Sequence, residues 1–147
     1  MSAERFLSLD IGEKRIGIAV SDPLGMIATP HSVLERRPGR RGIDEVIGKI
    51  AHLVDVLNIT EIVLGLPLRT DGRTGERESE VHEFARLLGE RIPARVVLID
   101  ERFTTSEATA SLLHDNVTRA RRKKLVDKVA AALILQQYLD RRRHQHK

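Results

Sequence analysis

The N-terminal quarter of the chain carries short apolar stretches of the kind that form strands. Residues 5–11, 15–22 and 26–35 each show this pattern, and short turns separate them. The connections are too short for a crossover helix, so the three strands are predicted to form an antiparallel meander. Gly17 and Ala19 in the second strand are small, and we therefore expect another element to approach that face closely.

The remainder of the chain alternates between helical and strand patterns. Residues 43–57 repeat apolar side chains at spacings of three, four and seven, which predicts a helix. After it, the pattern predicts a buried strand at 60–66 and a helix around 81–88, which Pro93 ends. A second buried strand at 96–99 and two helices, at about 105–114 and about 118–141, complete the chain. This order predicts an α/β fold with a mixed five-stranded sheet, three antiparallel strands followed by two parallel ones, flanked by helices.

The last predicted strand ends abruptly in charged residues. Its apolar run is followed by Asp100, Glu101 and Arg102, and Thr104 with Glu107 makes a capping box that starts the next helix. Ligands of such sheets bind beyond the carboxyl ends of the parallel strands. Acidic residues here fit a functional site and fit a charged loop where a strand surfaces equally well. Asp100 is interpreted as structural.

Two further acids occupy positions that are unfavourable for a carboxylate. Asp10 lies inside the first strand, although aspartate is depleted in strands. Asp127 lies within residues 125–135, a nearly continuous apolar stretch, too deep in the last helix to be an N-cap. A carboxylate held against a core needs a partner, a proton or a metal ion. For Asp127, an ion pair with a basic residue elsewhere is the alternative to a metal.

The predicted topology is expected to bring these acids together. The first and fourth strands lie side by side in such a sheet, and the last helix can cross their ends. Asp10, Glu101 and Asp127 would then share one site, where three carboxylates cannot all remain ionised without partners. Hard divalent cations bind carboxylate oxygens, so the pattern predicts a catalytic site that holds Mg²⁺ or Mn²⁺ through these three residues.

The composition narrows the class of protein. The 147 residues are 41% hydrophobic and 31% charged, which suits one globular domain with a core of its own. The lack of cysteine excludes disulfides and thiolate metal sites and fits a reducing compartment. The start of the chain does not resemble a secretory signal, and no apolar run approaches the ~20 residues of a membrane helix. We therefore expect a cytoplasmic protein with no membrane partner.

The net charge of +4 is unevenly distributed along the chain. Residues 119–147 contain ten basic and two acidic residues, whereas the preceding 118 residues carry a net charge of −4. A basic segment on a mildly acidic body favours nucleic acid as the partner, and a solvated helix end is the alternative. Aromatic residues make up only 3% of the chain, so phosphate contacts are expected to dominate over base stacking.

Four stretches, taken together, resemble one known family. They are LSLDIGEKRIGIAVSD, IVLGLPLRTDGRTGE, LIDERFTTSEA and RRKKLVDKVAAALILQQYLD, and they span residues 7–140 in this order. The chain resembles the YqgF/RuvX-type pre-16S rRNA nucleases, which are Holliday-junction-resolvase-like members of the RNase H-like superfamily. This resemblance implies an RNase H-like fold with catalytic acids at Asp10, Glu101 and Asp127.

The resemblance also implies an activity, a divalent-metal-dependent nuclease that processes the 5′ end of precursor 16S rRNA in ribosome biogenesis. Two ions ~3.5–4 Å apart would activate a water and stabilise the leaving 3′-oxygen, with Asp10 as their bridge. The alternatives are a resolvase of branched DNA, which would need a homodimer and not a monomer, and a non-catalytic nucleic-acid-binding factor. A phosphotransferase of the sugar-kinase type is disfavoured, because 147 residues cannot supply a second lobe.

Several basic residues are expected to hold phosphates near the acids. They lie beside the predicted acids, in the polar loop at 69–78 and at the start of the last helix: Lys14, Arg15 and Arg102; Arg69 and Arg73; Arg121, Arg122, Lys123 and Lys124. Surface salt bridges are the alternative for the first three, and residues 36–41 and 69–77 are the next candidates for a nucleic-acid surface. One domain is predicted over residues 1–140, with a basic, disordered tail over residues 141–147.

Overall fold

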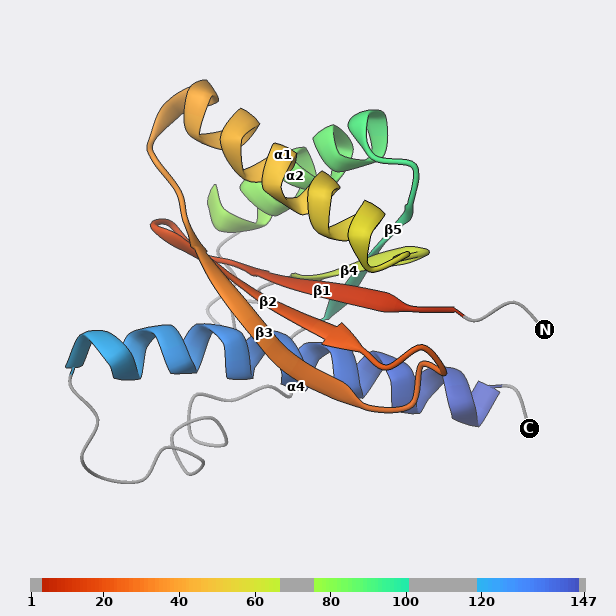
Figure 1. Ribbon diagram of the computed structural model, residues 1–147. Coiled ribbons are helices and arrows are strands. Elements are labelled where there is room, and N and C mark those ends of the chain that lie inside the picture. The colour runs from red at the N-terminus through yellow and green to blue at the C-terminus, as the bar shows by residue number, and fades with distance from the viewer. Residues whose placement is uncertain (1–3, 67–75, 101–118, 146–147) are drawn as a thin grey trace.

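The computed structural model describes residues 4–66, 76–100 and 119–145, and the side chains of residues 76–77, 119–125 and 145 fall outside that description. The elements run in the order β1 (Phe6–Ile11), β2 (Arg15–Ser21), β3 (Ala28–Glu35), α1 (Gly39–Val56), β4 (Glu61–Leu66), α2 (Glu76–Arg91), β5 (Arg95–Asp100) and α4 (Arg119–Gln145). Figure 1 shows their arrangement.

The strands form one mixed sheet in the order β3-β2-β1-β4-β5. β1 pairs antiparallel with β2 and parallel with β4, so it is the central strand. β2 and β3 are antiparallel, with a shift of register between Ile18 and Ala19, and β4 and β5 are parallel. The predicted arrangement of three antiparallel strands followed by two parallel ones is therefore confirmed. The carboxyl ends of β1, β4 and β5 meet at one edge, which we call the carboxyl edge.

Helices cover both faces of the sheet and give the protein three layers (Figure 1). α1 and α2 enclose one core with the sheet, and α4 encloses a second core on the opposite face. Successive side chains of β1 point to opposite faces of the sheet. Leu7 and Leu9 belong to the core under α1 and α2, whereas Phe6 belongs to the core under α4. Strands buried on both faces explain the nearly continuous apolar runs in β4 and β5.

α4 runs antiparallel to β1 along the lower face in Figure 1. The Ser8 hydroxyl donates a hydrogen bond to the Ala131 carbonyl, at 2.6 Å, in the middle of both elements. Further along the helix, the Tyr138 hydroxyl donates to Glu61 Oε1, at 2.6 Å, at the start of β4. The last turns of α4 thus lie over the amino ends of the parallel strands, and its first half extends to the carboxyl edge.

The last turns of α4 are fixed by Arg142. Its guanidinium lies 4.9 Å from the centre of the Phe6 ring and pairs with Glu4 at 2.7 Å and with Glu61 at 3.6 Å. These contacts explain why the helix continues to Gln145. The prediction that it ends near residue 141 and leaves a disordered tail is wrong for residues 141–145, because Arg142 has partners that are distant in sequence.

α1 and α2 both begin earlier than the apolar pattern indicated. α1 starts at Gly39, where the extended backbone of Pro38 precedes it, and its polar first turn carries no apolar periodicity. Gly42 lets that turn pack on the preceding loop, since a Cβ there would lie 1.8 Å from the Arg37 carbonyl oxygen. α2 starts at Glu76, inside the predicted polar loop. The helix predicted at 105–114 lies outside the described residues.

In the part of the chain that the structure describes, no helix combines the length and the apolar character that crossing a membrane requires.

Candidate active site

Asp10 lies near the carboxyl end of β1 and is partly buried. It is two residues beyond Ser8, which contacts α4, and strand alternation therefore places Asp10 on the α4 side of the sheet. The two neighbouring strands hold β1 by hydrogen bonds on both edges. The side chain of Asp10 thus lies on the α4 side of the central strand of the sheet.

Asp127 reaches the same region from α4 through a close contact with Gly17. A Cβ at Gly17 would lie 2.0 Å from the Asp127 carbonyl oxygen, so the helix can approach only because this residue is glycine. Gly17 is the cross-strand partner of Asp10, and such partners have Cα atoms about 4.5–5.5 Å apart. The backbones of Asp10 and Asp127 therefore lie within about 10 Å of each other. The close approach predicted for the small residues of β2 is confirmed at Gly17.

The carboxylate of Asp127 is paired with Arg15, the first residue of β2. Arg15 Nε donates to Asp127 Oδ2 at 2.7 Å, and the two side chains are only 29% and 24% exposed. The ion pair that the sequence left open as an alternative for Asp127 is therefore present. The Asp127 carboxylate can still accept further partners, because an ionised aspartate offers about four lone-pair sites on two oxygens.

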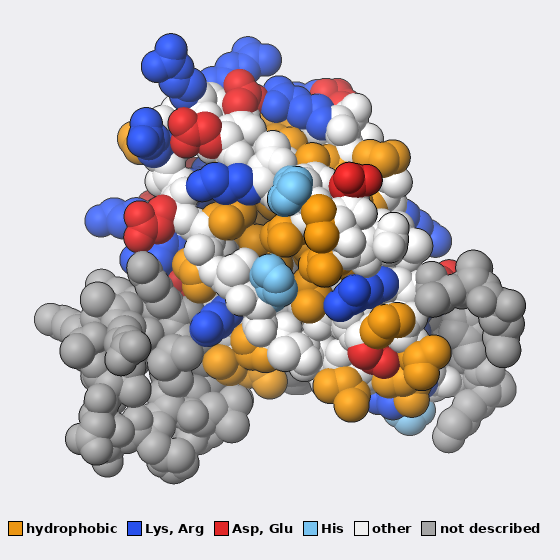
Figure 2. Space-filling view, in the orientation of Figure 1, with side chains coloured by type: hydrophobic (Ala, Val, Ile, Leu, Met, Phe, Trp, Pro, Cys, Tyr) orange, Lys and Arg blue, Asp and Glu red, His pale blue; other side chains and the backbone are white. Residues whose placement is uncertain are grey.

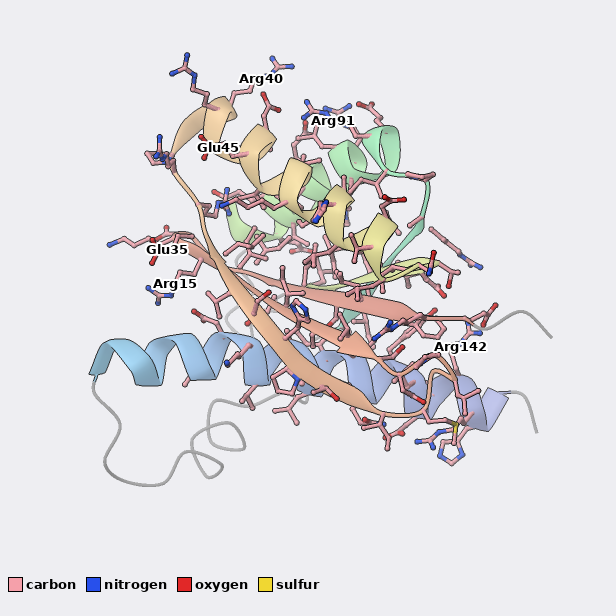
Figure 3. The ribbon with its side chains drawn as sticks, viewed as in Figure 1. Arg15, Glu35, Arg40, Glu45, Arg91 and Arg142 are labelled. Carbon is pink, nitrogen blue, oxygen red and sulfur yellow. The ribbon has the colours of Figure 1, made fainter. Side chains whose placement is uncertain are left out.

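The turn between β1 and β2 closes the carboxyl edge beside Asp10. The Gly12 amide donates to the Arg15 carbonyl at 2.9 Å, and exposed Lys14 lies at the tip of the turn. Arg36, which follows β3, reaches across this turn, with its Nη1 donating to the Gly12 carbonyl at 2.8 Å. Figure 3 shows Arg15 at this end of the molecule and Arg142 at the other. Three basic residues, Lys14, Arg15 and Arg36, therefore lie at the edge where the backbones of the two aspartates come close together.

A family described as "RuvX: Holliday junction resolvase" matches residues 4–141, nearly the whole chain. The chain belongs to the RuvX family. The family resemblance of its four sequence stretches is thereby confirmed.

RuvX-family relatives of similar length carry one recurring name. A protein of Syntrophomonas wolfei called "Putative pre-16S rRNA nuclease" is 44% identical over 136 residues, 92% of this chain and 94% of the relative. A protein of the same name from Clostridium botulinum is 41% identical over 136 residues, 92% of this chain and 96% of the relative.

Solved structures show that this RuvX chain has the RNase H-like fold of RuvC. Thermus thermophilus RuvC superposes with a TM-score of 0.62, covering 95% of this chain and 96% of RuvC, at 10% sequence identity. The same protein in complex with a Holliday junction substrate gives a TM-score of 0.64, with 96% of each chain covered, again at 10% identity. At such low identity these comparisons concern the fold alone.

The structure of this RuvX chain brings together only some of the predicted site residues. Asp10, Asp127 and Arg15 lie together, and Lys14 lies on the adjoining turn. Glu101 follows directly after Asp100, the last residue of β5, but it lies outside the described residues, as do Arg69, Arg73 and Arg102. The backbone of α4 includes four more predicted residues whose side chains are not described: Arg121, Arg122, Lys123 and Lys124.

The donor set suits a hard divalent cation, although the described residues do not complete a site. Among them, no group of three or more His, Asp or Glu side chains is placed to hold a metal ion. Asp10 and Asp127 supply carboxylate oxygens, the ligands that Mg²⁺ and Mn²⁺ prefer. The predicted third carboxylate, Glu101, continues from the strand that ends at the same edge. Asp10 and Asp127 are therefore consistent with the predicted metal ligands.

Sequence reasoning missed two residues that position α4 over this RuvX site. Ser8 is fully buried and holds the helix by its bond to Ala131, and its only signal was its place on the same face as Asp10. Glu61 is 7% exposed and binds Tyr138 near the far end of the helix. An acid at the first residue of a buried strand is unusual enough to have marked it.

Proposed function

We propose that this RuvX-family chain is a metal-dependent nuclease that processes the 5′ end of precursor 16S rRNA. The observation that carries the proposal is that Gly17 brings the backbones of Asp10 and Asp127 close together at the carboxyl edge. The name shared by relatives at 41–44% identity supports the substrate. We also propose that the chain forms one domain and acts in the cytoplasm, where precursor rRNA is processed.

Three acids would hold the metal, Asp10 from β1, Asp127 from α4 and Glu101 after β5. A pair of divalent ions, when bound, would supply an activated water and charge stabilisation for the leaving 3′-oxygen. Asp10 suits a ligand that must not move, because β1 is paired on both edges. Arg15 orients Asp127 and balances its charge through their ion pair. The sequence position of Lys14 at the tip of the turn suits contact with a phosphate beside the cleaved bond.

We propose that basic residues of α4 and of the segments that follow β4 and β5 in the sequence guide the substrate to the carboxyl edge. Residues of the first turns of α4 are proposed to hold phosphates by charge alone, with little reading of sequence: Arg121, Arg122, Lys123 and Lys124. Arg69, Arg73 and Arg102 are proposed to contribute from segments next to β4 and β5.

Cleavage of branched DNA is the second candidate, and the family description "Holliday junction resolvase" favours it. A symmetric four-way junction requires two active sites related by a two-fold axis, so this candidate also requires a homodimer. Precursor rRNA processing has no such requirement.

The test compares the two substrates under one set of conditions. Purified protein is incubated with 5′-extended precursor 16S rRNA and with a four-way DNA junction, each with Mg²⁺, with Mn²⁺ and with excess EDTA. We expect cleavage of the rRNA extension with at least one of the metals and none with EDTA. Cleavage of the junction alone would transfer the function to branched DNA. Metal-independent cleavage, or cleavage of neither substrate, would contradict the proposal.

A further inference from the structure

A second group of basic residues lies at the carboxyl edge, on the side of the sheet opposite α4. The loop between β3 and α1 and the first turn of α1 carry four arginines within six residues, which we call the arginine rim: Arg36, Arg37, Arg40 and Arg41. In Figure 3, Arg40 lies at the start of α1, at the same end of the molecule as Arg15. The start of α4 lies at this end as well (Figure 1), and so do Asp10 and Asp127, which both lie beside Gly17.

The rim is fixed to the turn that follows Asp10. Arg36 binds this turn twice, through its side chain to the Gly12 carbonyl at 2.8 Å and through its amide to the Lys14 carbonyl at 2.9 Å. Gly12 is two residues beyond Asp10, about 7 Å along an extended strand. Gly42 holds the other end, because its missing Cβ lets the Arg37 backbone pack on α1. The segment predicted as a candidate surface is therefore anchored beside the active site.

The charges of the rim are weakly neutralised compared with other arginines of the protein. Arg37, Arg40 and Arg41 are exposed, and the first turn of α1 contains no acidic residue. Arg37 lies 3.9 Å from Glu45 with 79% of its side chain exposed, a contact of little strength. By contrast, Arg86 on α2 is held by both Glu83 and Glu90.

An acidic side chain near the arginine rim has a basic partner outside the rim, which leaves the rim suited to an external anion. Figure 2 shows Lys and Arg side chains over the upper part of the visible face, where α1 lies, with acidic side chains among them. Asp44, one of the acids of α1, is already paired with Arg91 of α2 at 2.5 Å. Guanidinium groups bind phosphate oxygens with paired hydrogen bonds, so phosphate is the anion that suits this group of arginines best.

We propose that the arginine rim is a second phosphate-binding surface, which holds the nucleic-acid backbone on the α1 side of the carboxyl edge. The proposal rests on the proposed nuclease function and extends it. A backbone bound there passes over the turn that follows Asp10, and the basic first turns of α4 lie on the other side of that turn. The rim holds the substrate through phosphates and therefore does not read its sequence.

The test removes the three exposed charges and leaves Arg36, which has a structural role. The variant carries Arg37→Gln, Arg40→Gln and Arg41→Gln. A matched control removes three exposed arginines from the opposite end of the molecule, by Arg95→Gln, Arg141→Gln and Arg143→Gln. Binding to a labelled RNA duplex with a 5′ extension and to a labelled four-way DNA junction is followed by fluorescence anisotropy in EDTA, over a series of KCl concentrations.

We expect the rim variant to bind at least one of the two nucleic acids about tenfold or more weakly than wild type at low salt. The plot of log binding constant against log salt should flatten by about two to three units, the release expected from three lost phosphate contacts. The control variant should keep the wild-type slope. Thermal melting of both variants checks that they remain folded.

An unchanged slope in the folded rim variant on both nucleic acids, or an equal loss in the control, would overturn the proposal. Cleavage by wild type with Mg²⁺ or Mn²⁺ is measured separately on the same substrates. Cleavage by wild type together with an unchanged slope in the rim variant would contradict the proposal for the rim but support the nuclease function. A flattened slope in the rim variant without any cleavage by wild type would contradict the nuclease function but support the phosphate-binding surface.

Discussion

Asp127 can approach Asp10 only because residue 17 is glycine and has no side chain. Gly17 faces the Asp127 carbonyl so closely that Gly17→Ala must displace either β2 or α4. We expect this change to lower the free energy of unfolding by about 1–3 kcal/mol, as overpacking does in other cores, and to reduce cleavage as the aspartates separate. Denaturant titration and a cleavage assay measure the two effects.

Gly48 provides the matched control for that substitution. It lies in the middle of α1, and a Cβ there would meet no atom within 4 Å. Gly48→Ala should leave cleavage intact and stabilise the protein by up to about 1 kcal/mol, because alanine favours a helix. Equal effects of the two substitutions would show that the contact between Gly17 and Asp127 does not govern the position of α4.

At the level of elements, α4 is held at its far end by an unusual buried group. The Tyr138 hydroxyl donates to Glu61, which is only 7% exposed, and burial of Tyr138 raises its pKa, as does the bond to Glu61. Tyr138→Phe removes the donor and leaves a buried carboxylate oxygen poorly satisfied. We expect a loss of about 1–3 kcal/mol in denaturant titration. Arg95→Gln, which removes a 79%-exposed cation 3.9 Å from Glu61, should change stability by less than about 0.5 kcal/mol.

The turn between β2 and β3 should make part of the stability depend on acid. Asp22 Oδ1 accepts the amides of Ile27 at 2.8 Å and Met26 at 2.7 Å, and the bond from Ile27 is the main reason that the pKa of Asp22 is lowered from 3.8. A lowered pKa means that the ionised form contributes stability above the ordinary value, and this contribution is lost as the pH falls through the lowered one. In the Asp22→Asn variant, the side chain at position 22 cannot gain a proton at low pH. The free energy of unfolding of this variant should therefore fall less steeply than that of wild type below about pH 4. Parallel curves would assign the acid sensitivity to other carboxylates.

At the level of the whole molecule, local pattern predicted the sheet because β1, β2, β4 and β5 are short and apolar, and because short turns join the first three strands. Asp10 and Asp127 were also predictable, because each conflicts with its own surroundings in the sequence. The partner of Asp127 was not, since Arg15 lies 112 residues away and only the packing of α4 on β2 brings the two together. The first turn of α1 was missed for a related reason, because Gly39, Arg40 and Arg41 carry no apolar periodicity and pack through Gly42.

The central claim is that the carboxylates at the carboxyl edge form the cleavage site, and Asp10→Asn tests it most directly. This substitution keeps the size of the side chain and removes one ligand charge. Asp22→Asn is the control, because it removes the same charge from a turn at the other end of β2 and keeps an oxygen for the two amides. Cleavage of precursor 16S rRNA is measured for wild type and both variants at saturating Mn²⁺, with melting curves recorded alongside. We predict a loss of about 1,000-fold or more in Asp10→Asn, equivalent to about 4 kcal/mol of transition-state stabilisation, and wild-type turnover in Asp22→Asn. Wild-type turnover in a folded Asp10→Asn protein would contradict the account.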